Sequence, residues 1–277
     1  MRNVRGLCLP GKGPEFFRGG RRVAPPGAWR RPPMPHVKLI LEYEGTAYHG
    51  WQVQPGLPTI QGLLQDALAK IAGAPVQVTG AGRTDAGVHA LGQVASFRAD
   101  TRLGPLTLRR ALNASLPRDI VIRHAEEVPP DFDAQRSARS KTYRYSILAR
   151  DHPSAFLARH SLYVPVPLEF ATMARAAEFV IGTHDFSAFR AGTCAAATPV
   201  RTVLRASWRP EGDLWQFEIT ANGFLQHMVR ILVGTLLEVG RGKRRPSQVG
   251  EVLAARDRRQ AGKTAPPHGL CLVEVHY

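Results

Sequence analysis

Period-two strands and amphipathic helices alternate along this chain of 277 residues. Apolar residues occupy every second position of residues 36–43, which predicts a β-strand with one buried face. Residues 60–71 carry apolar side chains at intervals of three and four, which predicts a helix. Thr59 supplies an N-cap hydroxyl for that helix, and Gly73 a stop. A chain that mixes both periods in this way is predicted to fold as an α+β protein.

The second half of the chain repeats this pattern. Residues 141–148 predict a strand that presents Tyr143 and Tyr145 on one face. Residues 226–239 carry the clearest helical stripe, which Gly240 ends. Further elements are expected at 76–79, 94–97, 106–116, 168–181 (with Met173, Ala177, Val180 and Ile181 facing inward), 203–208, 214–220 and 270–277. The two sets of elements indicate two α+β domains, residues 36–132 and 139–277.

Composition excludes several classes of protein. A hydrophobic fraction of 44% is too high for a wholly disordered chain. The sequence lacks the run of about 18 apolar residues that a membrane-spanning helix needs, so we expect no membrane association. The three cysteines, Cys8, Cys194 and Cys271, form no CxxC pair and no disulfide framework. We therefore expect a reducing, cytoplasmic compartment.

The charge balance points to a polyanionic partner. Thirty-seven basic residues against 22 acidic residues give a net charge of +15, and nucleic acid is the leading candidate for a chain of this kind. Residues 1–35 hold eight basic residues and one acidic residue, so about half of the excess lies there. A generally solvated basic surface is the alternative interpretation.

Residues 1–35 are rich in Gly, Pro and Arg and have no periodicity, so we expect a disordered extension. The segment lacks the apolar stretch of a secretory signal. Three interpretations stay open: an RNA-binding arm, an organelle transit peptide, or a translation start at Met34. We favour a start at Met34, because a regular strand begins almost directly after it.

The loop of residues 80–90 has the most unusual composition. It reads Gly-Ala-Gly-Arg-Thr-Asp-Ala-Gly-Val-His-Ala and lies between two predicted strands. Its glycines permit backbone angles that other residues avoid and let a ligand approach the main chain. Asp85 is then either a turn residue that bonds its own backbone or a carboxylate held in a cleft. Local composition alone leaves both readings open.

The motif Gly-Arg-Thr-Asp-Ala-Gly-Val-His closely resembles the signature of the tRNA pseudouridine synthase A family. Other segments resemble that family in the same order, so the resemblance covers residues 36–277. Glu44 stands where the family usually has Asp, outside the catalytic motif. The further matching segments are residues 43–54, 141–145, 185–190, 223–230 and 265–272.

The resemblance implies a fold and a reaction. The implied fold has two ferredoxin-like-related domains whose mixed, mainly antiparallel sheets form a basic cleft. The implied reaction converts uridine to pseudouridine at positions 38, 39 and 40 in the anticodon arm of tRNA. It breaks an N–C glycosidic bond, makes a C–C bond and needs no cofactor. A homodimer is also implied, with each anticodon arm touching both subunits.

Five residues are candidates for the site. Asp85 is the implied catalytic carboxylate, which either attacks the sugar or the uracil ring or acts as a base on the sugar. Tyr143 offers a stacking platform for the base, and Leu270 an apolar wall. Arg230 is implied to pair with Asp85 and keep it ionised in a desolvated pocket. Arg83 would hold phosphate or occupy the space that a flipped base leaves.

Other functions receive less support from the sequence. No histidine or cysteine spacing matches a metal site, and no P-loop or Rossmann glycine pattern is present, so neither metal nor nucleotide cofactor is expected. One alternative function is a non-catalytic RNA-binding protein, in which Asp85 is a turn residue. Another is a pseudouridine synthase that acts on a different RNA.

Overall fold

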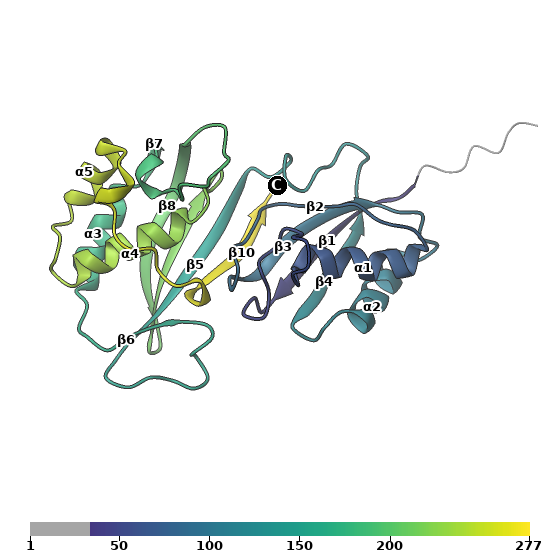
Figure 1. Cartoon of the computed structure of the whole chain (residues 1–277), viewed down its shortest axis with the longest axis horizontal. Helices are drawn as coiled ribbons and strands as arrows, with labels where there is room; N and C mark the ends of the chain where they lie inside the picture. Colours follow the sequence, from purple (N-terminus) through teal and green to yellow (C-terminus); the bar gives the residue numbers. More distant parts are fainter. Residues whose placement is uncertain (1–33) are drawn as a thin grey trace, which may run out of the picture. The chain divides into compact units, whose positions relative to one another are not determined.

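A ten-stranded sheet runs through the part of the chain that this computed structural model describes, residues 34–277 (Figure 1). Its main path has the order β4-β1-β3-β10-β5-β9-β8-β7, while β2 pairs with β3 and β6 with β5. Only the β3–β10 and β5–β6 pairs are parallel. The strands are β1 (His36–Tyr43), β2 (Val78–Gly80), β3 (His89–Arg98), β4 (Ile120–Glu127), β5 (Ser140–Ala149), β6 (Leu162–Val164), β7 (Gly182–Asp185), β8 (Val200–Glu211), β9 (Leu214–Ala221) and β10 (Leu270–His276). The predicted α+β class and the mainly antiparallel pairing are confirmed.

Five α-helices accompany the sheet in residues 34–277. They are α1 (Ile60–Ala72), α2 (Pro105–Ser115), α3 (Phe170–Glu178), α4 (Met228–Gly240) and α5 (Gln248–Ala255). The limits of α1 are those that the sequence predicts. The Thr59 hydroxyl accepts a hydrogen bond from the Gly62 N–H, and Gly73 takes a left-handed conformation with φ 70°. None of these helices is long and apolar enough to cross a membrane.

Two helices differ from the prediction. Helix α4 begins two residues later than expected because His227 has a left-handed backbone with φ 63°. Helix α3 is shorter than the predicted 168–181, and Ile181 is 42% exposed instead of facing inward. The chain leaves the helix after Glu178 and turns at Gly182, which has φ 107°, so Ile181 lies outside the packed face.

One face of the sheet carries the core and all the main helices. Cross-strand register places Tyr143 opposite Leu272 and Ile219, and all three are buried. Helices α1 and α2 pack at the end of the sheet formed by β1–β4, while α3 and α4 pack against β5 and β8 (Figure 1). The central strands β10 and β5 lie between these two groups of helices.

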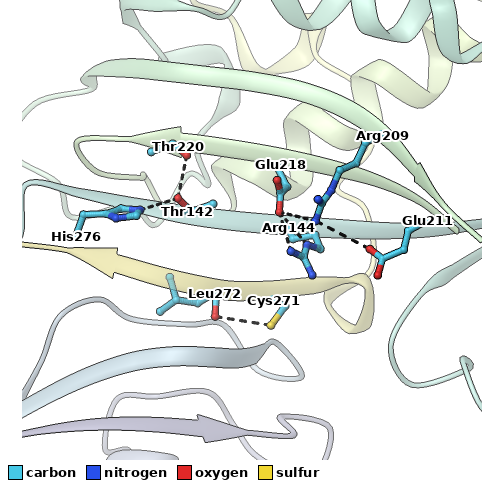
Figure 2. A network of polar contacts seen from close by, with 9 residues as sticks. All are labelled: Thr142, Arg144, Arg209, Glu211, Glu218, Thr220, Cys271, Leu272 and His276. Atoms are coloured by element: carbon cyan, nitrogen blue, oxygen red, sulfur yellow. Dashed lines mark hydrogen bonds and ion pairs between the residues drawn. The ribbon is translucent and has the colours of Figure 1, made fainter. Parts of the chain in front are cut away.

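The opposite face of the central strands is polar, as Figure 2 shows. Arg144 donates two hydrogen bonds, from Nε at 3.0 Å and from Nη2 at 2.8 Å, to Glu218 Oε1. Arg209 also reaches that oxygen, at 3.2 Å. The Thr142 and Thr220 hydroxyls share a 2.9 Å hydrogen bond across the same two strands. Charge on this face is therefore largely paired between neighbouring strands.

The sheet joins the two halves of the chain through β10. This last strand pairs with β3 through Cys271–His89 and Leu272–Ala90, and with β5 on its other side. Residues 34–277 thus share one sheet, and the division into domains at 36–132 and 139–277 stays a prediction. The extension predicted for the N-terminus lies outside the described residues as far as Pro33.

Candidate active site

Buried polar groups hold the loop between β2 and β3 in place. The Thr84 hydroxyl shares a 2.8 Å hydrogen bond with the Tyr43 hydroxyl, and Thr84 is 6% exposed. Gln93 donates from Nε2 to the Gly82 carbonyl at 2.8 Å. The Trp51 N–H donates to the Thr84 carbonyl at 3.0 Å. These bonds turn Thr84 inward and hold the loop on both sides of it.

A cavity of about 990 Å³ opens above this loop. Four of the five predicted site residues line it: Arg83, Asp85, Tyr143 and Leu270. They come from the loop, from β5 and from the start of β10. The fifth, Arg230, lies on α4 and contacts Asp85 directly. Tertiary structure therefore brings all five together around one cavity.

Asp85 and Arg230 form an ion pair between two distant parts of the sequence. Arg230 Nη1 donates to Asp85 Oδ2 at 2.9 Å, and Arg230 Nε donates to the Ala265 carbonyl at 2.8 Å. The Ala265 N–H in turn donates to the Arg230 carbonyl at 3.0 Å. The guanidinium is thus held on two sides, and its charge opposes the cost of partly burying the carboxylate. Among residues 34–277, the other carboxylate oxygen, Oδ1, has no hydrogen-bond partner.

His227 is a second neighbour of Asp85 that sequence reasoning did not assign to the site. Its Nε2 lies 3.6 Å from Asp85 Oδ2, and the residue lines the cavity. A positive φ in a residue other than glycine is uncommon and costs conformational energy. His227 has this left-handed backbone, with φ 63°, and the conformation points its imidazole towards the carboxylate. No sequence pattern indicates it.

Tyr143 and Leu270 supply the apolar part of the cavity. Tyr143 is 6% exposed and Leu270 5%, and both contribute to the lining. The Tyr143 ring meets Phe224 edge to face, with centroids 4.9 Å apart. Burial raises the pKa of the Tyr143 phenol well above its usual range, so the ring stays neutral. Tyr145, by contrast, donates its hydroxyl to the Pro266 carbonyl at 2.9 Å, a bond that gives it a structural role.

Three further cations reach the cavity. Arg83 is exposed and lines it, as do Lys141 at the start of β5 and Arg201 on β8. Lys141 belongs to a segment that the sequence singled out, but neither it nor Arg201 was predicted as a site residue. Asp85 is the only carboxylate among the lining residues, so the cavity has an excess of positive charge. Such a surface suits a polyanion.

His89, in the same sequence motif, supports the loop from the opposite face. Its Nδ1 accepts a 3.0 Å hydrogen bond from the Gly45 N–H, and its Nε2 faces the His268 carbonyl at 3.2 Å. Glu44 and His160 place ligand-type atoms nearby, within 4.8 Å of one another and of His89. Both ring nitrogens of His89 are already engaged with backbone, so this group is built for structure. Burial lowers the pKa of His89, which favours the neutral ring.

Comparison with known proteins identifies the family. A family model described as tRNA pseudouridine synthase matches residues 39–135 and 176–277. The chain is 48% identical over 244 residues to a tRNA pseudouridine synthase A of Acetivibrio thermocellus, covering 88% of this chain and all of that protein. It is 48% identical to the protein of that name in Myxococcus xanthus, covering 88% of this chain and 92% of that protein. The chain belongs to the tRNA pseudouridine synthase family.

In this tRNA pseudouridine synthase family member, the matched ranges contain Asp85, Arg230 and Leu270. Tyr143 and Lys141 fall in the interval between the two ranges. The cavity nevertheless places Tyr143 with Asp85 and Leu270, and β5, which carries Tyr143, lies beside β10 in the sheet.

Proposed function

We propose that this chain converts uridine to pseudouridine in tRNA and that Asp85 is the catalytic carboxylate. The observation that carries the proposal is the Asp85–Arg230 pair at a cavity with an apolar wall. The carboxylate oxygens of a turn aspartate would accept hydrogen bonds from nearby backbone N–H groups. Asp85 instead bonds a guanidinium 145 residues away in the chain and keeps Oδ1 open.

The reaction rearranges bonds without any net gain or loss of atoms. The bond between uracil N1 and ribose C1′ breaks, and a bond between C5 and C1′ forms. The hydrogen on C5 leaves as a proton, and N1 gains one. Asp85 can attack C1′, attack the uracil ring, or take a proton from the sugar, and each role requires an ionised carboxylate. Arg230 supports that ionised state in a site that a bound base would shield from water.

The remaining residues hold the base. A uridine in a folded RNA must leave its stack to reach a carboxylate at the floor of a cavity. Tyr143 and Leu270 then offer apolar surface to the ring while it detaches, rotates and rejoins. Arg83, exposed beside Asp85, binds a phosphate or occupies the space that the flipped base vacates.

The finer assignments rest on the family resemblance. They are the target uridines at positions 38, 39 and 40 and a homodimer in which each anticodon arm touches both subunits. A cytoplasmic location is proposed on other grounds, because the three cysteines form no disulfide framework. The excess of positive charge supports a large anionic partner. A comparison of tRNA transcripts that each retain uridine at one of the three positions tests the first assignment, and light scattering tests the second.

Tritium release tests the central proposal. When C5 bonds to C1′, tRNA labelled with tritium at uracil C5 loses its label to water. We expect the wild-type protein to release tritium and Asp85→Asn to release none while it still binds tRNA. If folded wild-type protein binds tRNA without releasing tritium from any tRNA, a non-catalytic RNA-binding function or another RNA substrate replaces this proposal.

A further inference from the structure

The cavity contains a second charged region that the proposed chemistry does not use. Lys141 lies two residues before Tyr143 on β5, so both side chains are on the helix-bearing face of the sheet. Arg201 lies on β8, two residues before Val203, which pairs with Ala221 of β9. Ala221 pairs on its other side with Lys141. Lys141 and Arg201 therefore approach the same part of the cavity from two strands, across a small residue.

Neither cation has a carboxylate partner in the described part of the chain. The Lys141 side chain makes no ion pair and no hydrogen bond there, although its backbone pairs with Ala221 and Val275 in the sheet. Arg201 uses Nη1 to donate to the Thr198 and Val200 carbonyls, at 2.8 and 2.6 Å. This leaves Nε and Nη2 of Arg201 for another acceptor.

Each cation lies against a glycine in a segment that resembles the family: Lys141 against Gly82, and Arg201 against Gly223. A Cβ on Gly82 would come within 3.3 Å of Lys141 Nζ, and one on Gly223 within 3.4 Å of Arg201 Nε. Side chains at these two positions would crowd the charged groups. The loops that carry Asp85 and His227 thus leave room for two unpaired cations.

Two unpaired, half-buried cations side by side are unfavourable without an anion. Burial, followed by the charge of Arg201, lowers the pKa of Lys141, and burial lowers the pKa of Arg201. In proteins, a nearby carboxylate usually balances such cations. Asp85 is the only carboxylate among the lining residues described, and it is paired with Arg230. An anionic ligand that bridges both groups would remove the penalty.

We propose that Lys141 and Arg201 form a binding site for one RNA backbone phosphate next to the uridine that reacts. This proposal rests on the proposed function, since the uridine is placed by Asp85 and Tyr143. Residues two apart on a strand are separated by about 7 Å, so a base against Tyr143 has its own sugar–phosphate within reach of Lys141. The two cations then act as positioning residues that fix the nucleotide and take no part in bond rearrangement.

A neutral-linkage scan tests the site. The probe is a synthetic anticodon-arm RNA hairpin in which one phosphate at a time is replaced by an uncharged methylphosphonate. Binding is measured in the Asp85→Asn background, so that no turnover occurs. We expect one linkage beside the target uridine to weaken binding about tenfold when neutral, the size of one lost charge-assisted hydrogen bond.

Lys141→Gln should weaken binding of the unmodified hairpin by a similar factor. In this variant, neutralising that same linkage should cause no further loss of affinity. The salt dependence of log K should also become shallower by about 0.7 to 0.9 per lost contact. Lys141→Arg should restore most of the affinity. Lys70→Gln, on the exposed surface of α1, is the matched control and should bind like the parent. In Arg201→Gln, too, neutralising that linkage should cause no further loss of affinity. This second variant tests the site if Lys141→Gln fails to fold.

Two binding results would overturn the site. In the first, the affinity lost in Lys141→Gln adds in full to the affinity lost at every neutral linkage. In the second, Lys141→Gln loses no affinity. A fall in kcat with unchanged KM for Lys141→Gln in the otherwise wild-type enzyme would also overturn it, because that places Lys141 in the chemistry. Failure of the proposed function is seen separately, as wild-type protein that releases no tritium, whereas failure of the phosphate site alone leaves tritium release by the wild type intact.

Discussion

Two arginine–carboxylate pairs lie on opposite faces of the same sheet and have nearly the same length. Arg230 meets Asp85 at 2.9 Å in the cavity, and Arg144 meets Glu218 at 2.8 Å on the polar face. Their exposures are also similar, between 13% and 23% for all four side chains. Distance and burial therefore do not separate a reactive pair from a structural one.

The surroundings of the two carboxylates do separate them. Glu218 sits between two neighbouring strands and receives Arg209 as well as Arg144, so its charge is satisfied by the sheet itself (Figure 2). Asp85 comes from a loop, meets a helix residue and opens into a cavity. A carboxylate is available for chemistry when one partner stabilises its charge and the other side is left for a ligand.

The largest expected effect is that of Asp85→Asn. The amide keeps the shape but loses the charge, and we expect tritium release from tRNA to fall at least a thousandfold, as for loss of an essential catalytic group. Affinity for tRNA and melting temperature should change little. If Asp85→Asn and Glu218→Gln lower activity to the same extent, the distinction between the two pairs is wrong.

Arg230→Lys should have the next largest effect. Lysine keeps the charge but cannot serve Asp85 and the Ala265 carbonyl together as the guanidinium does. We expect kcat to fall about ten- to a hundredfold, with KM for tRNA changed by less than about threefold. Steady-state kinetics with labelled tRNA measure both, and a rise in KM alone would assign Arg230 to RNA binding.

Tyr143 and Arg144 are adjacent in sequence and point to opposite faces of β5, which gives a sharp test of the comparison. Tyr143→Ala removes the ring beside the reacting base, and we expect kcat/KM to fall about tenfold or more. Tyr143→Phe should stay within about threefold of wild type, because the phenol remains neutral. Its pH–rate profile should also retain the same alkaline limb. A lost alkaline limb in Tyr143→Phe would contradict this.

Arg144→Met should affect stability and spare activity. It leaves Glu218 with only the half-exposed Arg209, at 3.2 Å. We expect the free energy of unfolding to fall by about 1 to 3 kcal/mol, the cost of a partly buried charge that loses a partner. Urea denaturation measures this, and tritium release at a temperature well below the transition should be unchanged. A large loss of activity in folded Arg144→Met would extend the site to the polar face.

The smallest expected effect concerns His89 and pH. Because burial lowers the pKa of His89, the folded protein disfavours its protonation. Stability from this residue is present above the ordinary histidine pKa of about 6.5 and is lost as pH falls below it. We expect the free energy of unfolding to decrease by up to about 1 kcal/mol between pH 7.5 and 5.5, and by less in His89→Gln. An equal decrease in both proteins would assign the pH dependence to other groups.

Local signals in the sequence predicted most of the elements. The strand at 36–43 and the helix from Thr59 to Gly73 appear with the expected limits, because periodicity and capping act over a few residues. The strands β4, β6 and β7 were not predicted. Two of them have only three or four residues, too few to show a period, and β4 mixes charged residues into its second half.

The five site residues were predicted through the resemblance to a known family and not through periodicity. Composition alone left Asp85 as either a turn residue or a catalytic carboxylate. The contact with Arg230 is what supports our proposal of the second role, and no local rule foresees a bond across 145 residues. The left-handed backbone of His227 was likewise invisible, since residues other than glycine adopt it only where the surroundings enforce it.

The sequence by itself determined the α+β class, the excess of positive charge and the motif that carries Asp85. Tertiary structure decided which charges are paired and which are left for a ligand. It brings Arg230 to Asp85 and places Arg201 near Lys141, two cations that are 60 residues apart in the chain. The reason is physical: periodicity depends on neighbours along the chain, whereas the partner of a charge depends on how elements far apart in the chain pack together.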